Sequence, residues 1–231
     1  MKSAPWVAGS ALGLLLLALA TASPFDSLQK TVPLDFAGID TLEFRGNMSQ
    51  IRISSNRPPY ASYTDELDRP LDVRRTGSRM VITTSSERYL DVELGIPPSV
   101  RAIDAQYARI VTSERLQSMQ VTSSGSVTWE GDIARLDLRD PADRPKHADD
   151  DCGCDGTQFS VSGGHIDELV VRSSHGQLSL SAPDKIDAVY AWLGGKKGVT
   201  LENAHRFDNI HLLATEAQLP DAASPKPATG P

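Results

Sequence analysis

The sequence contains little of several residue types, and each scarcity excludes a class of protein. Only two cysteines occur in 231 residues, and neither lies near the N-terminus, so there is no lipoprotein attachment site. Basic residues (23) are outnumbered by acidic ones (30), which argues against binding to nucleic acid or to an anionic membrane surface. No G-x-S-x-G sequence, glycine-rich phosphate loop or histidine pair at metalloenzyme spacing is present. We therefore expect a protein that is not an enzyme and needs no cofactor.

The N-terminus carries a targeting signal. Lys2 precedes an apolar run over residues 11–20, and Ala20-Thr21-Ala22 has the form of a signal-peptidase site. Because the run is too short and wrongly flanked for a stable membrane span, we predict a cleaved signal peptide over residues 1–22. The alternative is an uncleaved N-terminal anchor. Cleavage would give an exported protein. We expect it in the periplasm, with an extracellular location as the alternative.

The rest of the chain is predicted to form one β domain over residues 23–218. An acidic insertion, residues 140–156, interrupts this domain. A tail over residues 219–231 is rich in Ala, Pro, Ser and Gly, a composition that predicts disorder.

From residue 99 onward an apolar-x-apolar unit recurs. The intervals between its first members are 16, 17, 33, 20 and 21 residues, and the interval of 33, close to two units, spans the insertion. A second short strand accompanies most units, with Gly, Ser or Asn at the corners. The unit occurs at Ile103/Ala105, Met119/Val121, Leu136/Leu138, Leu169/Val171, Val189/Ala191 and Ile210/Leu212.

This period predicts an all-β fold, a parallel β-solenoid in which each coil stacks on the last. A β-sandwich is the alternative, because short strands at regular spacing also suit it. In the best-formed unit, residues 167–181, two alternating runs would form successive sides of one coil. Leu169, Val171, Leu178 and Leu180 would then point inward, and Glu168, Val170 and Arg172 outward.

Most of the chain resembles a known family. Residues 64–84 (TDELDRPLDVRRTGSRMVITT) and 89–105 (YLDVELGIPPSVRAIDA), followed by Ser- and Gly-rich coils, are similar to the bacterial auto-transporter adhesin, head GIN domain family. In that family an amphipathic strand ends in a proline before the first full coil, the place that Pro97-Pro98 takes here. The resemblance covers about residues 30–215. It implies an exported, single-stranded right-handed parallel β-helix with irregular N-terminal coils and no established activity.

The insertion holds the sharpest local cluster, HADDDCGCD over residues 147–155. Its two cysteines, spaced C-x-C, would oxidise in an oxidising compartment. Their disulfide either staples the tip of a solvated acidic loop or, being strained, acts as a labile redox pair. A metal site is the third interpretation, although the spacing is typical neither of structural zinc nor of a calcium loop. Its candidate ligands are His147, Asp149, Asp150, Asp151, Cys152, Cys154 and Asp155.

The aromatic and the acidic residues on the strands each allow a functional and a structural interpretation. Exposed aromatic rings on a solenoid face could bind glycans by stacking on sugar rings, whereas inward ones would only pack the core; the candidates are Tyr107, Trp129, Tyr190 and Trp192. Among these, Trp129 shares parity with Val127 and is expected inside. Clustered aspartates could act as in polygalacturonase-like hydrolases, but outward carboxylates on strands are ordinary solubility residues; the candidates are Asp104, Asp137 and Asp167.

Taken together, these patterns predict a non-enzymatic module of the cell envelope that binds a protein or a glycan through one flat face of the solenoid. The alternative is a metal- or redox-linked protein centred on His147, Cys152 and Cys154. A homo-oligomer formed through the solenoid ends is a third hypothesis, because such ends expose unpaired strand edges.

Overall fold

A computed structural model describes residues 29–46, 48–64, 71–84, 90–141, 157–174, 176–181, 184–194, 198–202 and 207–220. Within these ranges the chain forms β-strands and a single turn of 3₁₀ helix, η3, which confirms the all-β class. None of these residues forms a helix with the length and hydrophobicity that crossing a bilayer requires. The predicted signal peptide, residues 1–22, lies outside the described part of the chain.

The strands are short, between three and nine residues each. Their bounds are β1 (Gln29–Pro33), β2 (Thr41–Arg45), β3 (Met48–Ser54), β4 (Tyr60–Thr64), β5 (Asp72–Thr76), β6 (Arg79–Thr83), β7 (Leu90–Gly95), β8 (Ala102–Ala105), β9 (Tyr107–Thr112), β10 (Leu116–Thr122), β11 (Ser126–Glu130), β12 (Ile133–Arg139), β13 (Gln158–Gly163), β14 (His165–Ser173), β15 (Gln177–Leu180), β16 (Lys185–Leu193), β17 (Val199–Leu201) and β18 (Phe207–Leu212), followed by η3 (Glu216–Gln218).

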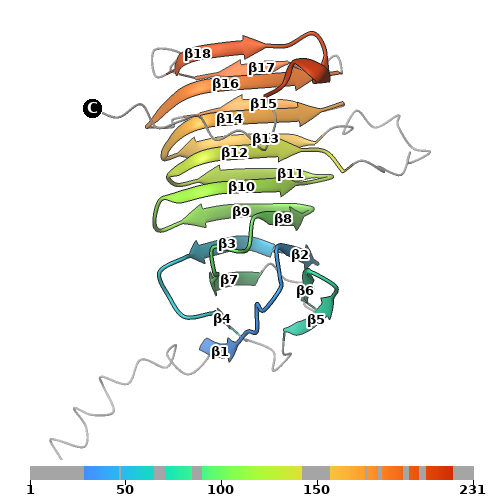
Figure 1. The fold of residues 1–231 in the computed structure, drawn as a ribbon, viewed down its shortest axis with the longest axis vertical. Helices are drawn as coiled ribbons and strands as arrows, with labels where there is room; N and C mark the ends of the chain where they lie inside the picture. Colours follow the sequence, from blue (N-terminus) through green and yellow to red (C-terminus); the bar gives the residue numbers. More distant parts are fainter. Residues whose placement is uncertain are drawn as a thin grey trace, which may run out of the picture.

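The strands form two nine-stranded sheets that lie face to face (Figure 1). Sheet A has the order β1-β4-β7-β3-β9-β11-β13-β15-β17, and sheet B has the order β18-β16-β14-β12-β10-β8-β2-β6-β5. From β8 to β18 the chain alternates between the two sheets, and each strand pairs in parallel with the strand two places along in sequence. One repeat is therefore a sheet B strand followed by a sheet A strand.

The N-terminal repeats are out of sequence order. The β2–β3 repeat lies between β6–β7 on one side and β8–β9 on the other, with parallel pairing throughout. Antiparallel strands close this end: β4 and β1 extend sheet A beyond β7, and β5 extends sheet B beyond β6, so both sheets are mixed. The segment carrying Pro97 and Pro98 connects β7 to β8 across the β2–β3 repeat. There the Ile96 amide bonds to Ser54 and the Arg101 amide bonds to Asp40, both through main-chain oxygens.

Buried side chains form columns that run through the stack of repeats. As expected, the apolar-x-apolar residues are interior from Ile103/Ala105 to Val189/Ala191, with Leu169 and Val171 in sheet B and Leu178 and Leu180 in sheet A. The last unit is an exception: Ile210 and Leu212 are exposed, because β18 is the edge strand of sheet B. A further interior position three residues earlier gives sheet B the longer pattern apolar-x-x-apolar-x-apolar. That additional column consists of Leu116, Ile133, Ile166, Ile186 and Phe207.

Two details of the repeat differ from the expected alignment. Ile103 stacks on Val121 and not on Met119, so β10 is displaced by two residues relative to β8. The interval of 33 residues holds one repeat and not two, because β12 and β14 are direct neighbours in sheet B and only β13 lies between them in sequence. The apolar-x-apolar pattern alone cannot fix either point, since a shift by two residues leaves the same faces buried.

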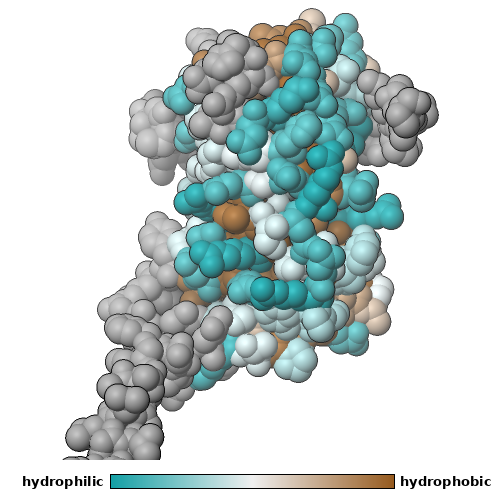
Figure 2. Space-filling model, turned by 90° about the vertical axis from the view of Figure 1, so that its left-hand side faces the viewer, coloured by the Kyte–Doolittle hydropathy of each residue, from teal (hydrophilic) through white to brown (hydrophobic). Residues whose placement is uncertain are grey.

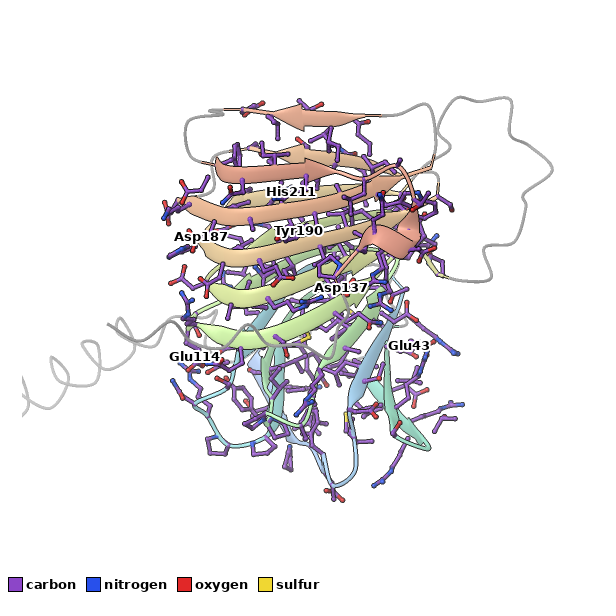
Figure 3. The ribbon with its side chains drawn as sticks, turned by 45° about the horizontal axis from the view of Figure 1, so that its top comes forward. Glu43, Glu114, Asp137, Asp187, Tyr190 and His211 are labelled. Atoms are coloured by element: carbon purple, nitrogen blue, oxygen red, sulfur yellow. The ribbon has the colours of Figure 1, made fainter. Side chains whose placement is uncertain are left out.

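The C-terminal segment crosses the outer face of sheet B, where η3 lies near Asp137 (Figure 3). The Pro220 carbonyl accepts hydrogen bonds from Arg135 (3.1 Å) and Arg172 (3.2 Å), and Leu219 is buried. Val170 points outward by alternation, yet it is 0% exposed. Its expected exposure was wrong because a segment distant in sequence covers the strand at this level.

Candidate binding surface

The residues of the predicted metal or redox cluster lie outside the described part of the chain. They are His147, Asp149, Asp150, Asp151, Cys152, Cys154 and Asp155. The described flanks of the insertion are held by the neighbouring repeats. Asp140 accepts hydrogen bonds from the Ser173 hydroxyl and the Ser174 amide, both at 2.8 Å, and the buried Thr157 hydroxyl donates to the Ser123 carbonyl at 3.2 Å.

An extended array of polar and charged side chains lies on the outer face of sheet B. Each sheet B strand from β10 to β18 has two consecutive outward residues after its first interior position, as in Ile166-Asp167-Glu168-Leu169. Parallel pairing places the equivalent residues of successive strands next to one another. The outer face therefore carries two adjacent rows of side chains across the strands.

The first row contains a charged ladder at the start of the sheet B strands. Arg115 donates to both oxygens of Asp167 at 2.6 Å, and Lys185 contacts Asp187 at 2.9 Å and Asp208 at 3.1 Å. His165 lies 3.4 Å from Asp187. On the side of the molecule in Figure 2, hydrophilic residues predominate, with only small hydrophobic areas between them.

The ladder favours the charged forms of Asp187 and Lys185. Partial burial acts to raise the pKa of Asp187, but hydrogen bonds from Lys185 and His165 outweigh it, and the pKa lies below its usual value. The pKa of Lys185 is raised, first by its hydrogen bond to Asp187 and then by the one to Asp208. Ligand atoms of His165, Asp167 and Asp187 all lie within 4.8 Å of one another, so a cation would fit sterically. Arg115 and Lys185 already neutralise these carboxylates, and the geometry is that of an ion-pair network.

The second row is more varied in chemistry. Arg135 on β12 donates to Glu168 on β14 at 2.6 Å, and these two side chains are only 14% and 22% exposed. Further along the strands, Tyr190 on β16 and His211 on β18 stack with ring centroids 4.8 Å apart and an angle of 8° between planes. Figure 3 shows the two rings on neighbouring strands of the same face.

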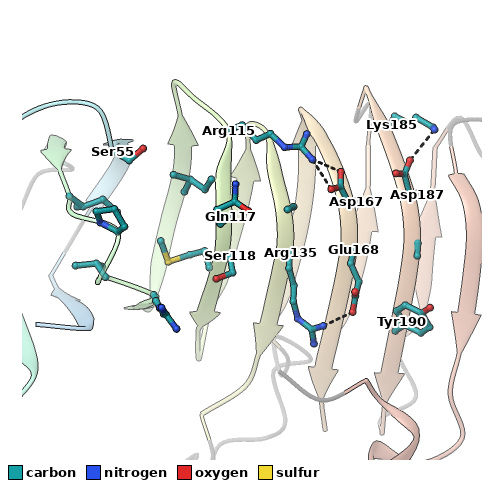
Figure 4. Close-up of a pocket in the computed structure, with 18 of the residues that line it drawn as sticks. Ser55, Arg115, Gln117, Ser118, Arg135, Asp167, Glu168, Lys185, Asp187 and Tyr190 are labelled. Carbon is teal, nitrogen blue, oxygen red and sulfur yellow. Dashed lines mark hydrogen bonds and ion pairs between the residues drawn. The ribbon is translucent and has the colours of Figure 1, made fainter. Parts of the chain in front are cut away.

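Residues of both rows line an open groove with a volume of about 1310 Å³. It runs across β10, β12, β14, β16 and β18 (Figure 4). Pro97 and Pro98, from the connection between β7 and β8, also line it. Neutral hydrogen-bonding groups, ion pairs and two stacked aromatic rings share its lining. The polar members are Ser55, Arg101, Arg115, Gln117, Ser118, Arg135, Asp167, Glu168, Lys185, Asp187, Tyr190, Asp208, Asn209 and His211.

The three aspartates considered for hydrolysis each pair with different arginines. Asp104 contacts Arg79 at 3.4 Å, and Asp167 is bound by Arg115. Asp137, which is buried, contacts Arg139 at 2.8 Å and Arg172 at 3.6 Å. No acid–base couple arises from these three carboxylates, because each already serves as a counter-ion.

The four aromatic candidates separate into two groups. Trp129 is interior, as expected, and its indole N–H donates to the Gly131 carbonyl at 3.1 Å. Tyr190 lines the groove, whereas Tyr107 is 50% exposed on β9 of sheet A, and Trp192 is partly exposed on β16.

Sequence reasoning did not single out Arg115, Lys185, Asp187 or Asp208. Their signal is present in the repeat: an interior residue followed by aspartate occurs at Ile166-Asp167, Ile186-Asp187 and Phe207-Asp208. Parallel stacking turns that recurrence into a ladder.

Comparisons with known proteins agree with the fold. The chain is similar to the crystal structure of a "putative adhesin" from Parabacteroides distasonis, with a TM-score of 0.51 and 9% identity, over 80% of this chain and 76% of that one. A second structure with that name, from Parabacteroides merdae, has a TM-score of 0.43 and 10% identity, over 80% and 95% of the two chains. A "putative lipid binding protein" from Parabacteroides distasonis has a TM-score of 0.34 and 11% identity, over 80% and 96%. No family model and no curated protein matches the chain. At these identities, the first match supports a shared all-β architecture and nothing narrower.

Proposed function

We propose that this protein is an exported, non-enzymatic binding module of the bacterial cell envelope, and that its ligand occupies the groove on the outer face of sheet B. The observation that carries the proposal is the in-register array of polar, charged and aromatic side chains along that groove. The ion pairs within the array leave hydrogen-bonding capacity on carboxylate oxygens, amides and hydroxyls. Such groups can bind a polar ligand without catalysing a reaction on it.

A glycan fits the groove better than an extended peptide. Peptides that bind to sheets commonly add a strand at a free edge, where main-chain groups are unpaired. The strands that floor the groove, β10 to β16, are paired on both sides, so only side chains are available there. Sugar hydroxyls can bond to Gln117, Glu168 and Asn209, and a pyranose ring can stack on the Tyr190 side chain.

The proposal is tested with the mature chain, residues 23–231, on an array of bacterial envelope glycans. We expect Tyr190→Ala to weaken binding by about 10-fold, which corresponds to the upper range of a stacking contact. Tyr107→Ala is the matched control, because this tyrosine is exposed on the other sheet and should leave binding unchanged. Failure to bind any glycan, or equal losses for the two variants, would refute a glycan site in this groove. Capture of an envelope protein in a Tyr190-dependent manner would assign the same groove to a protein ligand.

We further infer that the alternating strands wind as a right-handed parallel β-helix of the head GIN domain family, supported by the parallel two-apart pairing and by the Pro97-Pro98 crossing. Export follows from the predicted signal peptide. Mass spectrometry of the protein recovered from its host should give an N-terminus at Ser23. An N-terminus at Met1 would contradict cleavage.

For the insertion we propose a disulfide between Cys152 and Cys154, with the metal and labile redox interpretations as alternatives. Titration of free thiols before and after mild reduction, together with metal analysis of the purified protein, separates the three. Two free thiols without metal would exclude the bridge.

A further inference from the structure

The two ends of the stacked sheets are finished differently. At the N-terminal end, β5 carries the exposed Arg74 and Arg75, and β1 contains Lys30 and ends in Pro33. Charged residues and prolines on edge strands prevent further strand addition, because pairing would bury the charge or meet a residue without an amide proton. This end is therefore protected against association.

The C-terminal end is less protected in sheet B, because its edge strand β18 carries a single charged residue, Asp208, near its start, and no proline. The edge strand β18 pairs with β16, and in the described part of the chain no strand lies on its other side. Ile210 is 37% exposed and Leu212 is 66% exposed, although both continue interior columns, from Val189 and Ala191. The sheet A edge, β17, is only three residues long.

We propose that β18 pairs antiparallel with β18 of a second copy of this chain, forming a dimer with twofold symmetry. A two-strand pairing across a twofold axis is self-complementary and stops at two copies, whereas head-to-tail stacking would require the charged β5 edge and would continue without limit. Three observations indicate this occupant: the β18 edge is less protected, interior side chains are left exposed on it, and the opposite end is protected.

The register of the pairing follows from which side chains point inward. Opposed residues of an antiparallel pair lie on the same face. With His211 on the twofold axis, Ile210 of one copy faces Leu212 of the other, and all four aliphatic side chains lie on the interior side. The Tyr190–His211 ring stack then meets its symmetry mate on the outer side.

This arrangement would join the two copies of sheet B into one continuous sheet. The axis is perpendicular to that sheet, so the two outer faces, each with its groove, point in the same direction. A ligand with repeating units, such as the glycan proposed above, could then engage both grooves. Binding of the second groove becomes effectively intramolecular and raises the overall affinity without new contacts. The dimer itself does not depend on the proposed ligand.

Sedimentation equilibrium of the mature chain between about 1 and 100 µM tests the dimer. We expect Leu212→Lys to raise its dissociation constant by roughly 100-fold, because the pairing would bury an unpaired ammonium group. Val32→Lys on β1 is the matched control: Val32 is 37% exposed, as is Ile210, and lies at the opposite end. Unchanged far-UV circular dichroism and melting temperature establish that both variants fold.

Cross-linking tests the orientation. In a Cys152→Ser/Cys154→Ser background, His211→Cys should form a disulfide-linked dimer, because opposed Cα atoms near the axis lie about 4.5–5.5 Å apart, within the range of a disulfide. Tyr107→Cys, which is also exposed but lies on sheet A far from the axis, should not. A wild-type monomer at 100 µM, equal dissociation by the two lysine variants, or the absence of cross-linking at position 211 would each overturn the proposal.

Discussion

Gly164→Ala tests how closely the corners of successive repeats approach one another. Gly164 has φ +87°, in the left-handed region, and a Cβ built on it would lie 2.2 Å from the carbonyl carbon and oxygen of Gly131 in the preceding repeat. Gly77→Ala is the matched control, because Gly77 has φ +63° but no atom within 4 Å of the built Cβ. The two substitutions share the backbone strain and differ in the steric overlap.

The expected magnitudes follow from these two terms. A left-handed conformation costs an alanine about 1–2 kcal/mol, which is the full effect expected for Gly77→Ala. The added Cβ of residue 164 would lie 2.2 Å from the Gly131 carbonyl, so the two must separate by more than 1 Å to reach an ordinary contact distance of about 3.5 Å. Because the obstacle is main chain, the neighbouring repeat must shift, at a cost similar to overpacking a core, about 1–3 kcal/mol. Gly164→Ala should therefore destabilise the fold by about 2–5 kcal/mol.

Urea unfolding monitored by tryptophan fluorescence is the suitable assay. Trp129 is fully buried, and its indole N–H bonds to the Gly131 carbonyl, so it reports on the repeat that must move. The midpoint should fall further for Gly164→Ala than for Gly77→Ala, at an unchanged dependence on urea concentration. Equal losses would refute the argument, because they would mean that the corner yields to an added methyl group without cost.

Three further substitutions test contacts on the outer face of sheet B. Glu43→Gln should lower the stability of the fold by about 1 kcal/mol at pH 7. Burial acts to raise the pKa of Glu43, but hydrogen bonds from Arg79 and Arg45 outweigh it and lower the pKa. The stabilisation is therefore complete above the pKa of the unfolded state and is lost as the pH falls through the pKa of the folded state. Asp104→Asn should instead stabilise the fold, by less than about 0.5 kcal/mol after solvent screening. Burial and the nearby Glu43 raise the pKa of Asp104, so the folded state disfavours its charged form near neutral pH. Urea midpoints at pH 7 and pH 3 check both, and identical pH profiles for the two variants would contradict the signs. Leu219→Ala should loosen the C-terminal segment that lies over Val170. Cleavage by endoproteinase Glu-C after Glu216 should then become about 10-fold faster, equivalent to a loss of about 1.4 kcal/mol of local stability. An unchanged cleavage rate would show that Leu219 does not anchor this segment.

The local pattern of the sequence predicts the interior of this fold well and its outer face poorly. Alternation identifies Leu169, Leu178 and Trp129 as buried, because the two-residue period of a strand is a local property. The pairing of Ile103 with Val121 was missed, since a shift by two residues leaves the alternation intact. The burial of Val170 depends on a segment distant in sequence, which no local pattern shows.

The binding surface was predictable only in its location on a face of the repeats. The recurrence of an apolar residue followed by aspartate contains the ladder, but only the stacking of repeats brings Asp187 to Lys185 and Asp208. Arg115 is less predictable still, since its partner Asp167 lies 52 residues away and its reach crosses the intervening strand β12. Such contacts arise from long flexible side chains and leave no regular spacing.

The hydrogen bonds on both sides of the acidic insertion have a consequence for how this chain can change. The Arg139 carbonyl accepts a hydrogen bond from the Ser123 amide at 3.0 Å, and the Asp140 amide donates to the Arg172 carbonyl at 3.1 Å, so the start of the insertion is fixed by the repeats on either side. On the far side, the Gln177 amide bonds to the Thr157 carbonyl at 2.8 Å. The exit and re-entry points are therefore held by neighbouring repeats. Since lengthening a loop costs little once its ends are fixed, this corner can gain or lose residues without altering the register of β12 and β13, and it offers a site for grafting a foreign peptide.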